Sequence, residues 1–121
     1  MPLAPEDLAV LAATEEVEIE TSLPGGPAHR VIIWVVTDDR EAFIRSVRGE
    51  RGRWYREAVA NPRVTIHAPG RSIRARAVPA ADADSIARAS AGFERKYAED
   101  PSTPFMVVPE VLVTTLRLEP A

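Results

Sequence analysis

Six consecutive apolar residues, Val31 to Val36, place the strongest constraint on the fold of this chain. All of them except Trp34 are β-branched, and β-branched residues favour strands. A run without polar positions predicts a strand over residues 30–37 that is buried on both faces. A small antiparallel sheet buries only one face of a strand in its own core. The second face therefore requires a packed helix or a partner subunit.

Five other segments have the alternation of apolar and polar residues, or the flanking turns, that are typical of strands: residues 17–21, 41–47, 64–67, 73–77 and 111–118. Asp38-Asp39 and Pro69-Gly70 supply turns that join two pairs of neighbouring strands into hairpins. The chain is therefore expected to form six strands.

Apolar residues recur at helical spacing in residues 1–14, 53–60 and 82–98, and Asp82 or Asp84 is a suitable N-cap for the last helix. The strands do not alternate strictly with helices, as a parallel sheet requires. Closure of six strands into an antiparallel barrel removes exposed edges, and a curved open sheet is the alternative. We expect one mainly β (α+β) domain over residues 1–121, with the barrel in residues 16–118.

Composition and charge argue against several classes of function. The absence of cysteine removes disulfides and thiol chemistry, and it fits a cytoplasmic protein. Residues 1–14 lack a basic leader, and no apolar run approaches the roughly 20 residues that span a bilayer, so we expect no membrane contact. The net charge of −3 disfavours a general nucleic-acid binder. His29 and His67 have no carboxylates at metal-ligand spacing, which disfavours a zinc site.

The positive charge of this acidic chain is concentrated in one segment, which holds five arginines and one acid, Glu50: Arg45, Arg48, Arg51, Arg53 and Arg56. The segment joins an expected strand to an expected helix through a loop with Gly49 and Gly52. Glycines let a ligand approach the backbone closely, and the start of a helix presents free N–H groups to an anion. Arginine forks bind phosphate well. The alternative is that these arginines are solvated or paired with the chain's acids.

Aromatic residues accompany this segment. Trp54 and Tyr55, at the expected helix start, offer flat apolar surface to a conjugated ring. Trp54 on its own is typical of a core anchor, and Trp34 is typical of a core or interface residue. The combination of arginines, glycines and aromatic residues therefore indicates a ligand that carries both a phosphate and a ring.

Several of these motifs resemble, in order and spacing, the deazaflavin-dependent nitroreductase branch of the flavin (FMN)-binding split-barrel superfamily, which also includes pyridoxamine-phosphate-oxidase-like proteins. The similar segments are Gly52–Arg56, Ala60–Thr65 and Ile73–Ala77. A nearer resemblance is to a family of short bacterial proteins that is named only as a domain of unknown function. Its motifs match Ile33–Val36, Ile44–Gly49, Trp54–Arg56, Lys96-Tyr97 and Thr114–Leu118.

The resemblance implies a six-stranded split barrel, usually a homodimer, with a cofactor in a groove between the subunits. It implies that residues 46–49, Arg53 and Trp54 line the phosphate and the ring. With Arg51 and Tyr55 from the same segment, the candidate cofactor-binding residues are Ser46, Val47, Arg48, Gly49, Arg51, Arg53, Trp54 and Tyr55. The Gly-Arg-x-Ser-Gly stretch of the nitroreductase branch has no counterpart in residues 21–26, so FMN and F420 both stay open as cofactors.

The leading interpretation is a flavin- or deazaflavin-dependent oxidoreductase that anchors the cofactor phosphate through the Arg45–Arg56 segment and acts on a substrate that the sequence does not identify. No side chain is assigned as a catalytic acid or base, because the ring carries the hydride chemistry. The alternative is a non-catalytic module that binds a flavin, haem or another small anion. A third reading makes the arginine cluster an interaction patch for an acidic protein or a nucleic acid.

Overall fold

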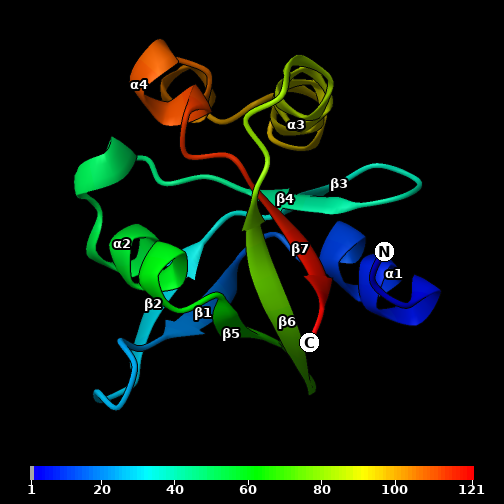
Figure 1. The fold of residues 1–121 in the computed structure, drawn as a ribbon. Coiled ribbons are helices and arrows are strands. Elements are labelled where there is room, and N and C mark those ends of the chain that lie inside the picture. The colour runs from blue at the N-terminus through cyan, green and yellow to red at the C-terminus, as the bar shows by residue number, and fades with distance from the viewer. Residues whose placement is uncertain (1) are drawn as a thin grey trace.

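The computed structural model describes residues 2–121, in which seven antiparallel strands form one sheet that curls on itself (Figure 1). The strand order is β2-β1-β5-β6-β7-β4-β3. The strands are β1 (Val17–Thr21), β2 (His29–Ile33), β3 (Val36–Thr37), β4 (Ala42–Ile44), β5 (Arg63–Ala68), β6 (Arg71–Pro79) and β7 (Leu116–Pro120). The helices are α1 (Pro5–Ala13), α2 (Arg53–Ala60), α3 (Ala83–Lys96) and α4 (Pro109–Leu112), with short 3-10 turns η1 (Gly49–Arg51) and η2 (Thr103–Met106).

The apolar run forms two strands instead of the predicted continuous strand. β2 pairs with β1 at one edge of the sheet and β3 pairs with β4 at the other, so Trp34 and Val35 carry the chain from one edge to the other. The Val35 carbonyl accepts hydrogen bonds from Lys96 Nζ (2.6 Å) and the Tyr97 hydroxyl (3.3 Å) in place of a neighbouring strand. The predicted count of six strands was wrong for this reason, whereas the mainly β, antiparallel barrel is confirmed.

The predicted helices begin and end close to α1, α2 and α3. The Asp82 carboxylate caps α3 by accepting a hydrogen bond from the Ser85 backbone N–H (2.9 Å). Two predicted strands are shorter than expected. Residues 41–47 form only β4, and the strand expected from residue 111 begins at Leu116 because Pro109 starts α4. No helix in residues 2–121 is long and apolar enough to cross a membrane.

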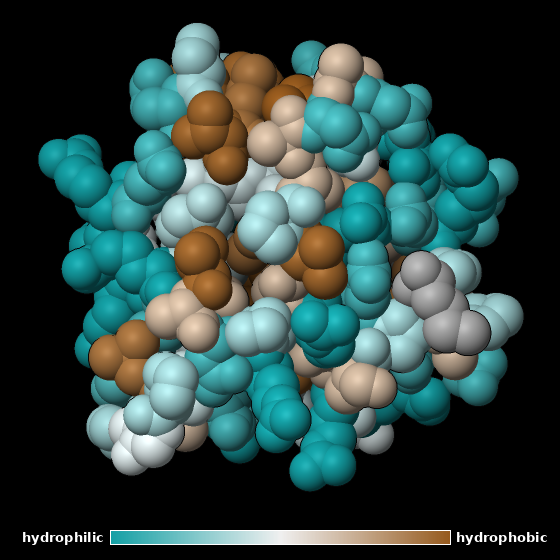
Figure 2. All heavy atoms as spheres, in the orientation of Figure 1, coloured by the Kyte–Doolittle hydropathy of each residue, from teal (hydrophilic) through white to brown (hydrophobic). Residues whose placement is uncertain are grey.

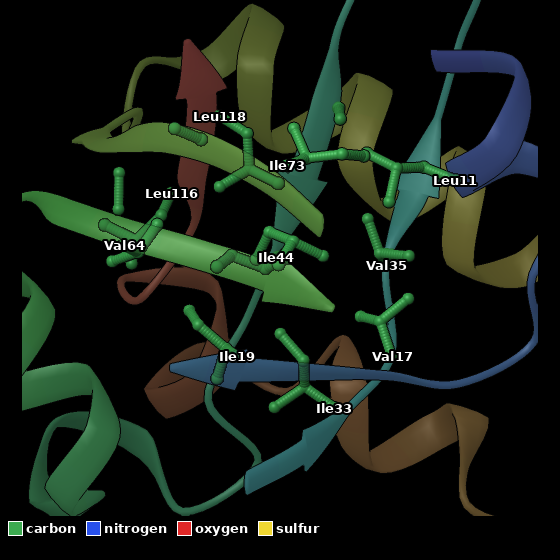
Figure 3. Close-up of a cluster of buried hydrophobic side chains, with 14 of the residues drawn as sticks. Leu11, Val17, Ile19, Ile33, Val35, Ile44, Val64, Ile73, Leu116 and Leu118 are labelled. Carbon is green, nitrogen blue, oxygen red and sulfur yellow. The ribbon is translucent and has the colours of Figure 1, made fainter. Parts of the chain in front are cut away.

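The inside of the curled sheet holds the larger apolar core (Figure 3). Ile19, Ile66 and Leu118, from β1, β5 and β7, are fully buried there. Leu11 of α1 and Trp54 of α2 join the same cluster, and Trp54 is only 8% exposed, which confirms its role as a core anchor. Each large aliphatic side chain buried in this way contributes about 1.5–3 kcal/mol. This core holds the start of α2 against the barrel.

A second core lies between β3, β4 and α3, where Phe43 packs with Phe93. Gly92 is needed on α3, because a Cβ at this position would lie 2.9 Å from the Cβ of Val36. Helix α3 therefore supplies the packed cover that the second half of the apolar run was predicted to need. The first half differs, because Ile32 on β2 is 61% exposed in the single chain.

Candidate functional site

A cavity of about 780 Å³ opens where β2, the loop after β4 and the start of α2 meet. Five of the predicted binding residues line it: Ser46, Val47, Arg48, Arg53 and Trp54. The other three, Gly49, Arg51 and Tyr55, are not part of its lining. The fold therefore places five of the eight predicted binding residues in the lining of one cavity and three outside it.

The loop between β4 and α2 is held in one shape by its own hydrogen bonds. The backbone N–H of Ser46 donates to Thr114 Oγ1 (3.0 Å), and the Ser46 hydroxyl donates to the Gly49 carbonyl (2.8 Å). Gly49 has φ +68°, a conformation that side chains disfavour, and a Cβ on Gly52 would collide with Ser46 Oγ. Gly49 is therefore required by the backbone of the loop and Gly52 by the position of the Ser46 hydroxyl. Because that hydroxyl donates to Gly49, Ser46 keeps lone pairs but no free proton for a ligand.

A buried carboxylate fixes helix α2 against β1 and β2. Glu57 accepts a hydrogen bond from the Thr21 hydroxyl (2.9 Å), and its Oε2 lies 3.1 Å from His29 Nδ1. Burial raises the pKa of Glu57, but the contacts with Thr21 and His29 lower it more, so the net shift is downward. Because Arg53 lies one helical turn before Glu57, these contacts also fix the backbone of Arg53 beside the cavity.

Arg45 does not extend toward a ligand as the sequence interpretation assumed. It is 2% exposed, and its guanidinium donates to Thr115 Oγ1 (2.8 Å), Ser90 Oγ, the Met106 carbonyl and the Ile86 carbonyl (each 3.0 Å). All four acceptors are neutral, and no carboxylate of residues 2–121 forms an ion pair with it. Burial lowers the pKa of Arg45 to about 10, so the group is still protonated at neutral pH. Arg45 therefore ties the helices to the barrel and leaves an unneutralised positive charge in the cavity wall.

The other four arginines of the segment are exposed, and within the described chain none has a carboxylate partner: Arg48, Arg51, Arg53 and Arg56. Hydrophilic residues predominate at the left edge of the molecule in Figure 2, on the side of η1 and α2, although apolar residues such as Val59 (51% exposed) are also exposed on α2. Only Arg48 and Arg53 reach the cavity. None of the four therefore forms an ion pair with an acid of residues 2–121, although the charge of Arg53 contributes to lowering the pKa of Glu57. Simple solvation describes Arg51 and Arg56.

Trp34 supplies an aromatic wall that the sequence did not assign to the site. Its ring stacks on Tyr97 with centroids 3.9 Å apart and planes inclined by 6°, and the Tyr97 hydroxyl is held by the Glu15 carbonyl (2.6 Å). Of the two predicted aromatic residues, Trp54 lines the cavity and Tyr55 packs against the larger core instead, whereas Trp34 lines the cavity in addition. The only sequence signal was a single large ring within an otherwise β-branched run.

The cavity also has an acidic side. Glu16 precedes β1 and lies near Trp34, because the adjacent residues Val17 and Ile33 are paired in the sheet. Asp100 also lines the cavity, in the turn after α3, where its backbone N–H donates to the Tyr97 carbonyl (3.1 Å). The arginines come instead from the loop before α2. A ligand that is anionic at one end and carries a neutral ring with N–H donors at the other fits this arrangement.

The two histidines lie outside the cavity lining. His29 contacts Glu57, and His67 lies on the sheet surface with its Nε2 2.8 Å from Glu20 Oε1 and its Nδ1 2.9 Å from Ser72 Oγ. Across residues 2–121 the structure contains no group of three or more potential metal-ligating His, Cys, Asp or Glu side chains.

Solved structures share this fold at low sequence identity. HutZ, the haem storage protein from Vibrio cholerae, is 16% identical with a TM-score of 0.71, and the match covers 100% of this chain and 92% of HutZ. A putative pyridoxamine 5'-phosphate oxidase from Listeria innocua is 15% identical with a TM-score of 0.67, covering 95% and 90% of the two chains. An F420-H2-dependent reductase, FDR-A, is 15% identical with a TM-score of 0.70, covering 87% and 94%. The curled sheet is therefore a split barrel.

Not all structures with this fold have the same length. The chain spans about half (53%) of the protein Atu2129 from Agrobacterium tumefaciens, at a TM-score of 0.71. No curated protein matches the sequence significantly. A family model does match, over residues 7–118, and its description is an uncharacterized protein conserved in bacteria, DUF2255. Because this match covers nearly all of the sequence, the chain belongs to that family.

Proposed function

We propose that the chain binds a flavin or deazaflavin, FMN or F420, in this cavity. The observation that carries the proposal is the charge of Arg45, which is buried in the cavity wall without a carboxylate. A buried charge is normally neutralised by a partner, and here the same cavity is lined by two more arginines that form no ion pair, Arg48 and Arg53. A bound anion supplies the missing negative charge.

Each residue then has a distinct part in binding. Arg48 and Arg53 donate to the phosphate, and Arg45 favours the anion through its field without touching it. Charge-assisted hydrogen bonds of this kind contribute about 1.5–3 kcal/mol each. Trp34 and Trp54 border the ring, and the acidic side of the cavity accepts hydrogen bonds from N–H groups at the far end of the ligand.

The activity proposed for the loaded protein is that of an oxidoreductase with an unassigned substrate. When bound, the ring supplies hydride transfer, and this chain holds and orients it. A non-catalytic binding module is the second candidate. For haem, iron is usually held by a His, Cys, Met or Tyr side chain, and Met106 alone represents these types in the lining. The lining thus favours a flavin or deazaflavin over haem.

We also propose that a second copy of the chain covers the mouth of the cavity. Ile32 and Val47 line it and are 61% and 59% exposed. An apolar pair at the rim of a charged hollow is typical of a surface that is buried on association. The second copy would bury the outer face of β2, where Ile32 is exposed in the single chain.

The proposal is tested by titrating FMN and F420 into the purified protein while following cofactor fluorescence. Arg48→Ala/Arg53→Ala should weaken FMN binding about 100-fold, which corresponds to the loss of two charge-assisted contacts. The control Arg51→Ala/Arg56→Ala removes the same charge outside the lining and should change affinity less than threefold. Riboflavin, which has no phosphate, should bind both variants equally.

Equal FMN affinity in the cavity variant and in the control would refute the phosphate assignment. Bound cofactor without reduction of quinones or nitro compounds would select the non-catalytic module, and a Soret band after haem addition would select haem. Sedimentation of the loaded protein as a monomer would exclude the second copy.

A further inference from the structure

Three arginines point outward from the β5–β6 hairpin, away from the cavity described above. Arg63 on β5 lies directly opposite Arg76 on β6, and Arg74 lies opposite Thr65. The alternation that buries Val64 and Ala75 inside the barrel places these arginines on the outer face, where all three are exposed. We call Arg63, Thr65, Arg74 and Arg76 the hairpin cluster.

The hairpin cluster is not neutralised by the protein. Within residues 2–121 none of its guanidinium groups forms an ion pair or donates a hydrogen bond. Like charges directly opposite each other on a sheet are destabilising, so the pairing of Arg63 with Arg76 costs stability in the free protein. Two other exposed arginines of the sheet are paired, Arg71 with Asp7 (2.7 Å) and Arg30 with Glu20 (3.2 Å), whereas the four exposed arginines of the cavity segment are not.

Two carboxylates that neighbour the cluster across the sheet are engaged by other residues. Glu119 on β7 lies opposite Arg76, but its Oε2 accepts from Arg117 Nε (2.9 Å). Glu20 on β1 lies opposite Thr65, and its Oε1 is held by His67 (2.8 Å) and Arg30 (3.2 Å). The acids nearest to the cluster in the sheet therefore leave its positive charge in place.

The cluster surrounds a second hollow of about 720 Å³, which Asn61 and Pro62 border at the end of α2. Its polar lining offers three forked guanidinium groups, the Thr65 hydroxyl and the Asn61 amide. Ala121 also borders the hollow but forms no ion pair with these arginines. Guanidinium forks match the paired oxygens of phosphate, and the three arginines carry a charge of +3, whereas one phosphate group carries about −1.5 to −2 at pH 7. The donor set therefore suits an anion with two adjacent phosphate groups.

We propose that the hairpin cluster is a second anion site, which binds a small molecule carrying a diphosphate group. It is separate from the cavity at Arg48 and Arg53 and does not depend on the cofactor assignment. The occupant relieves the repulsion between Arg63 and Arg76, so binding should stabilise the fold as well as saturate the site.

The test uses inorganic pyrophosphate at constant ionic strength, with binding followed by calorimetry and by amide chemical shifts. The expected result is a set of shifts at Thr65 and Arg74 that persists in the Arg48→Ala/Arg53→Ala protein. Arg63→Gln/Arg76→Gln should weaken this binding at least tenfold. The charge-matched control Arg40→Gln/Arg56→Gln uses two other exposed arginines, which form no ion pair or side-chain hydrogen bond within residues 2–121, and it should leave the affinity within threefold.

A second readout does not depend on the ligand. Without pyrophosphate and at low salt, Arg63→Gln/Arg76→Gln should unfold at a higher urea concentration than the control, because the like-charge pair is gone. Equal pyrophosphate affinity in variant and control, or shifts confined to Gly49 and Gly52, would overturn the proposal. Displacement of pyrophosphate by a short DNA duplex, with steep salt dependence, would overturn it in favour of a nucleic-acid surface.

Discussion

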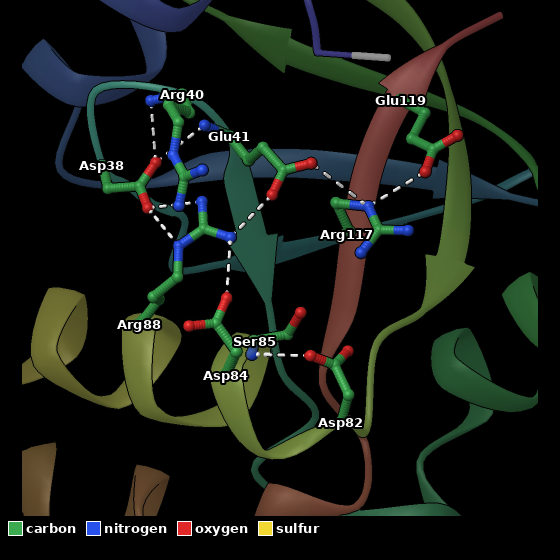
Figure 4. A network of polar contacts seen from close by, with 9 residues as sticks. All are labelled: Asp38, Arg40, Glu41, Asp82, Asp84, Ser85, Arg88, Arg117 and Glu119. Carbon is green, nitrogen blue, oxygen red and sulfur yellow. Dashed lines mark hydrogen bonds and ion pairs between the residues drawn. The ribbon is translucent and has the colours of Figure 1, made fainter.

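Arg45 and Arg88 are both largely removed from water, yet the protein surrounds them with opposite chemistry. Arg88 on α3 lies 2.6 Å from Asp38, 2.9 Å from Glu41 and 3.5 Å from Asp84, as Figure 4 shows. Burial lowers the pKa of Arg88, but the two nearest carboxylates raise it more, so the net shift is upward. Arg45 contacts only neutral acceptors, and burial lowers its pKa to about 10.

The difference teaches where this fold tolerates an unpaired charge. At Arg88 the charge joins a turn to a helix, and three carboxylates neutralise it. At Arg45 the hydrogen bonds likewise join separate elements, but no carboxylate neutralises the charge, which is available to attract an anionic ligand in the cavity. Buried cations without counter-ions are costly, so their location points to a function.

The largest effect is expected from removing Arg45. Arg45→Met leaves two carbonyls and two hydroxyls without their donor, which should lower the free energy of unfolding by about 3–5 kcal/mol. Because the partners are neutral, this loss should be the same at pH 4 and pH 7. Urea unfolding at both pH values measures it. A loss below about 1 kcal/mol would show that the four contacts do not hold the helices to the barrel.

A smaller and pH-dependent effect is expected at Arg88. Arg88→Met should cost about 1–3 kcal/mol at pH 7, because three carboxylates then face each other without a cation. Burial raises the pKa of Asp38, but backbone N–H groups of Glu41 and Arg40 and then Arg88 lower it further than burial raises it. A lowered folded-state pKa means that this stabilisation is present above an unfolded pKa of about 3.9 and is lost as pH falls through the folded value.

The difference in the free energy of unfolding between wild type and Arg88→Met should therefore become smaller as the pH is lowered to about 3. The corresponding difference for Arg45→Met should not change. Unfolding midpoints measured across this range check the contrast. If the stability losses of Arg45→Met and Arg88→Met had the same pH dependence, the contrast between a charge with neutral partners and a charge with carboxylate partners would be wrong.

The smallest effect on stability is expected when Arg45 is given the carboxylate that it lacks. Ser90→Asp places an acid beside the guanidinium and should change the free energy of unfolding by less than about 1 kcal/mol, since desolvation offsets the new ion pair. FMN affinity should fall at least tenfold, because the new carboxylate neutralises the charge of Arg45 and repels the phosphate. Ser90→Asn is the matched control. Unchanged FMN affinity in Ser90→Asp would show that the charge of Arg45 does not act on the ligand.

Much of the fold follows from local sequence patterns. The alternation in residues 17–21, 64–67 and 73–77 predicts β1, β5 and β6, and the helix over residues 53–60 coincides with α2. These elements were predictable because their periodicity and their turns lie within a few residues of each other. The division of the apolar run into β2 and β3 was not, because the donors at Val35 come from Lys96 and Tyr97, distant in sequence.

The candidate site was predictable as a segment but not as a set of side chains. Arg45 and Arg48 lie three residues apart and look alike in sequence, yet one is buried and the other exposed. What separates them is the position of acceptors on α3 and η2, which depends on tertiary packing. Trp34, Glu16 and Asp100 reach the cavity from other parts of the chain, and no local motif marks them.

The passage of the chain through Trp34 and Val35 has a mechanical consequence. The first and last strands of the sheet are consecutive in the chain, so the two residues between them, Trp34 and Val35, act as a covalent tether across the seam of the barrel. The seam cannot open without straining that tether, and Trp34 is part of it. Strain at the seam is therefore transmitted directly to an aromatic wall of the cavity, and Lys96 and Tyr97, which donate to the Val35 carbonyl, brace the tether from the end of α3.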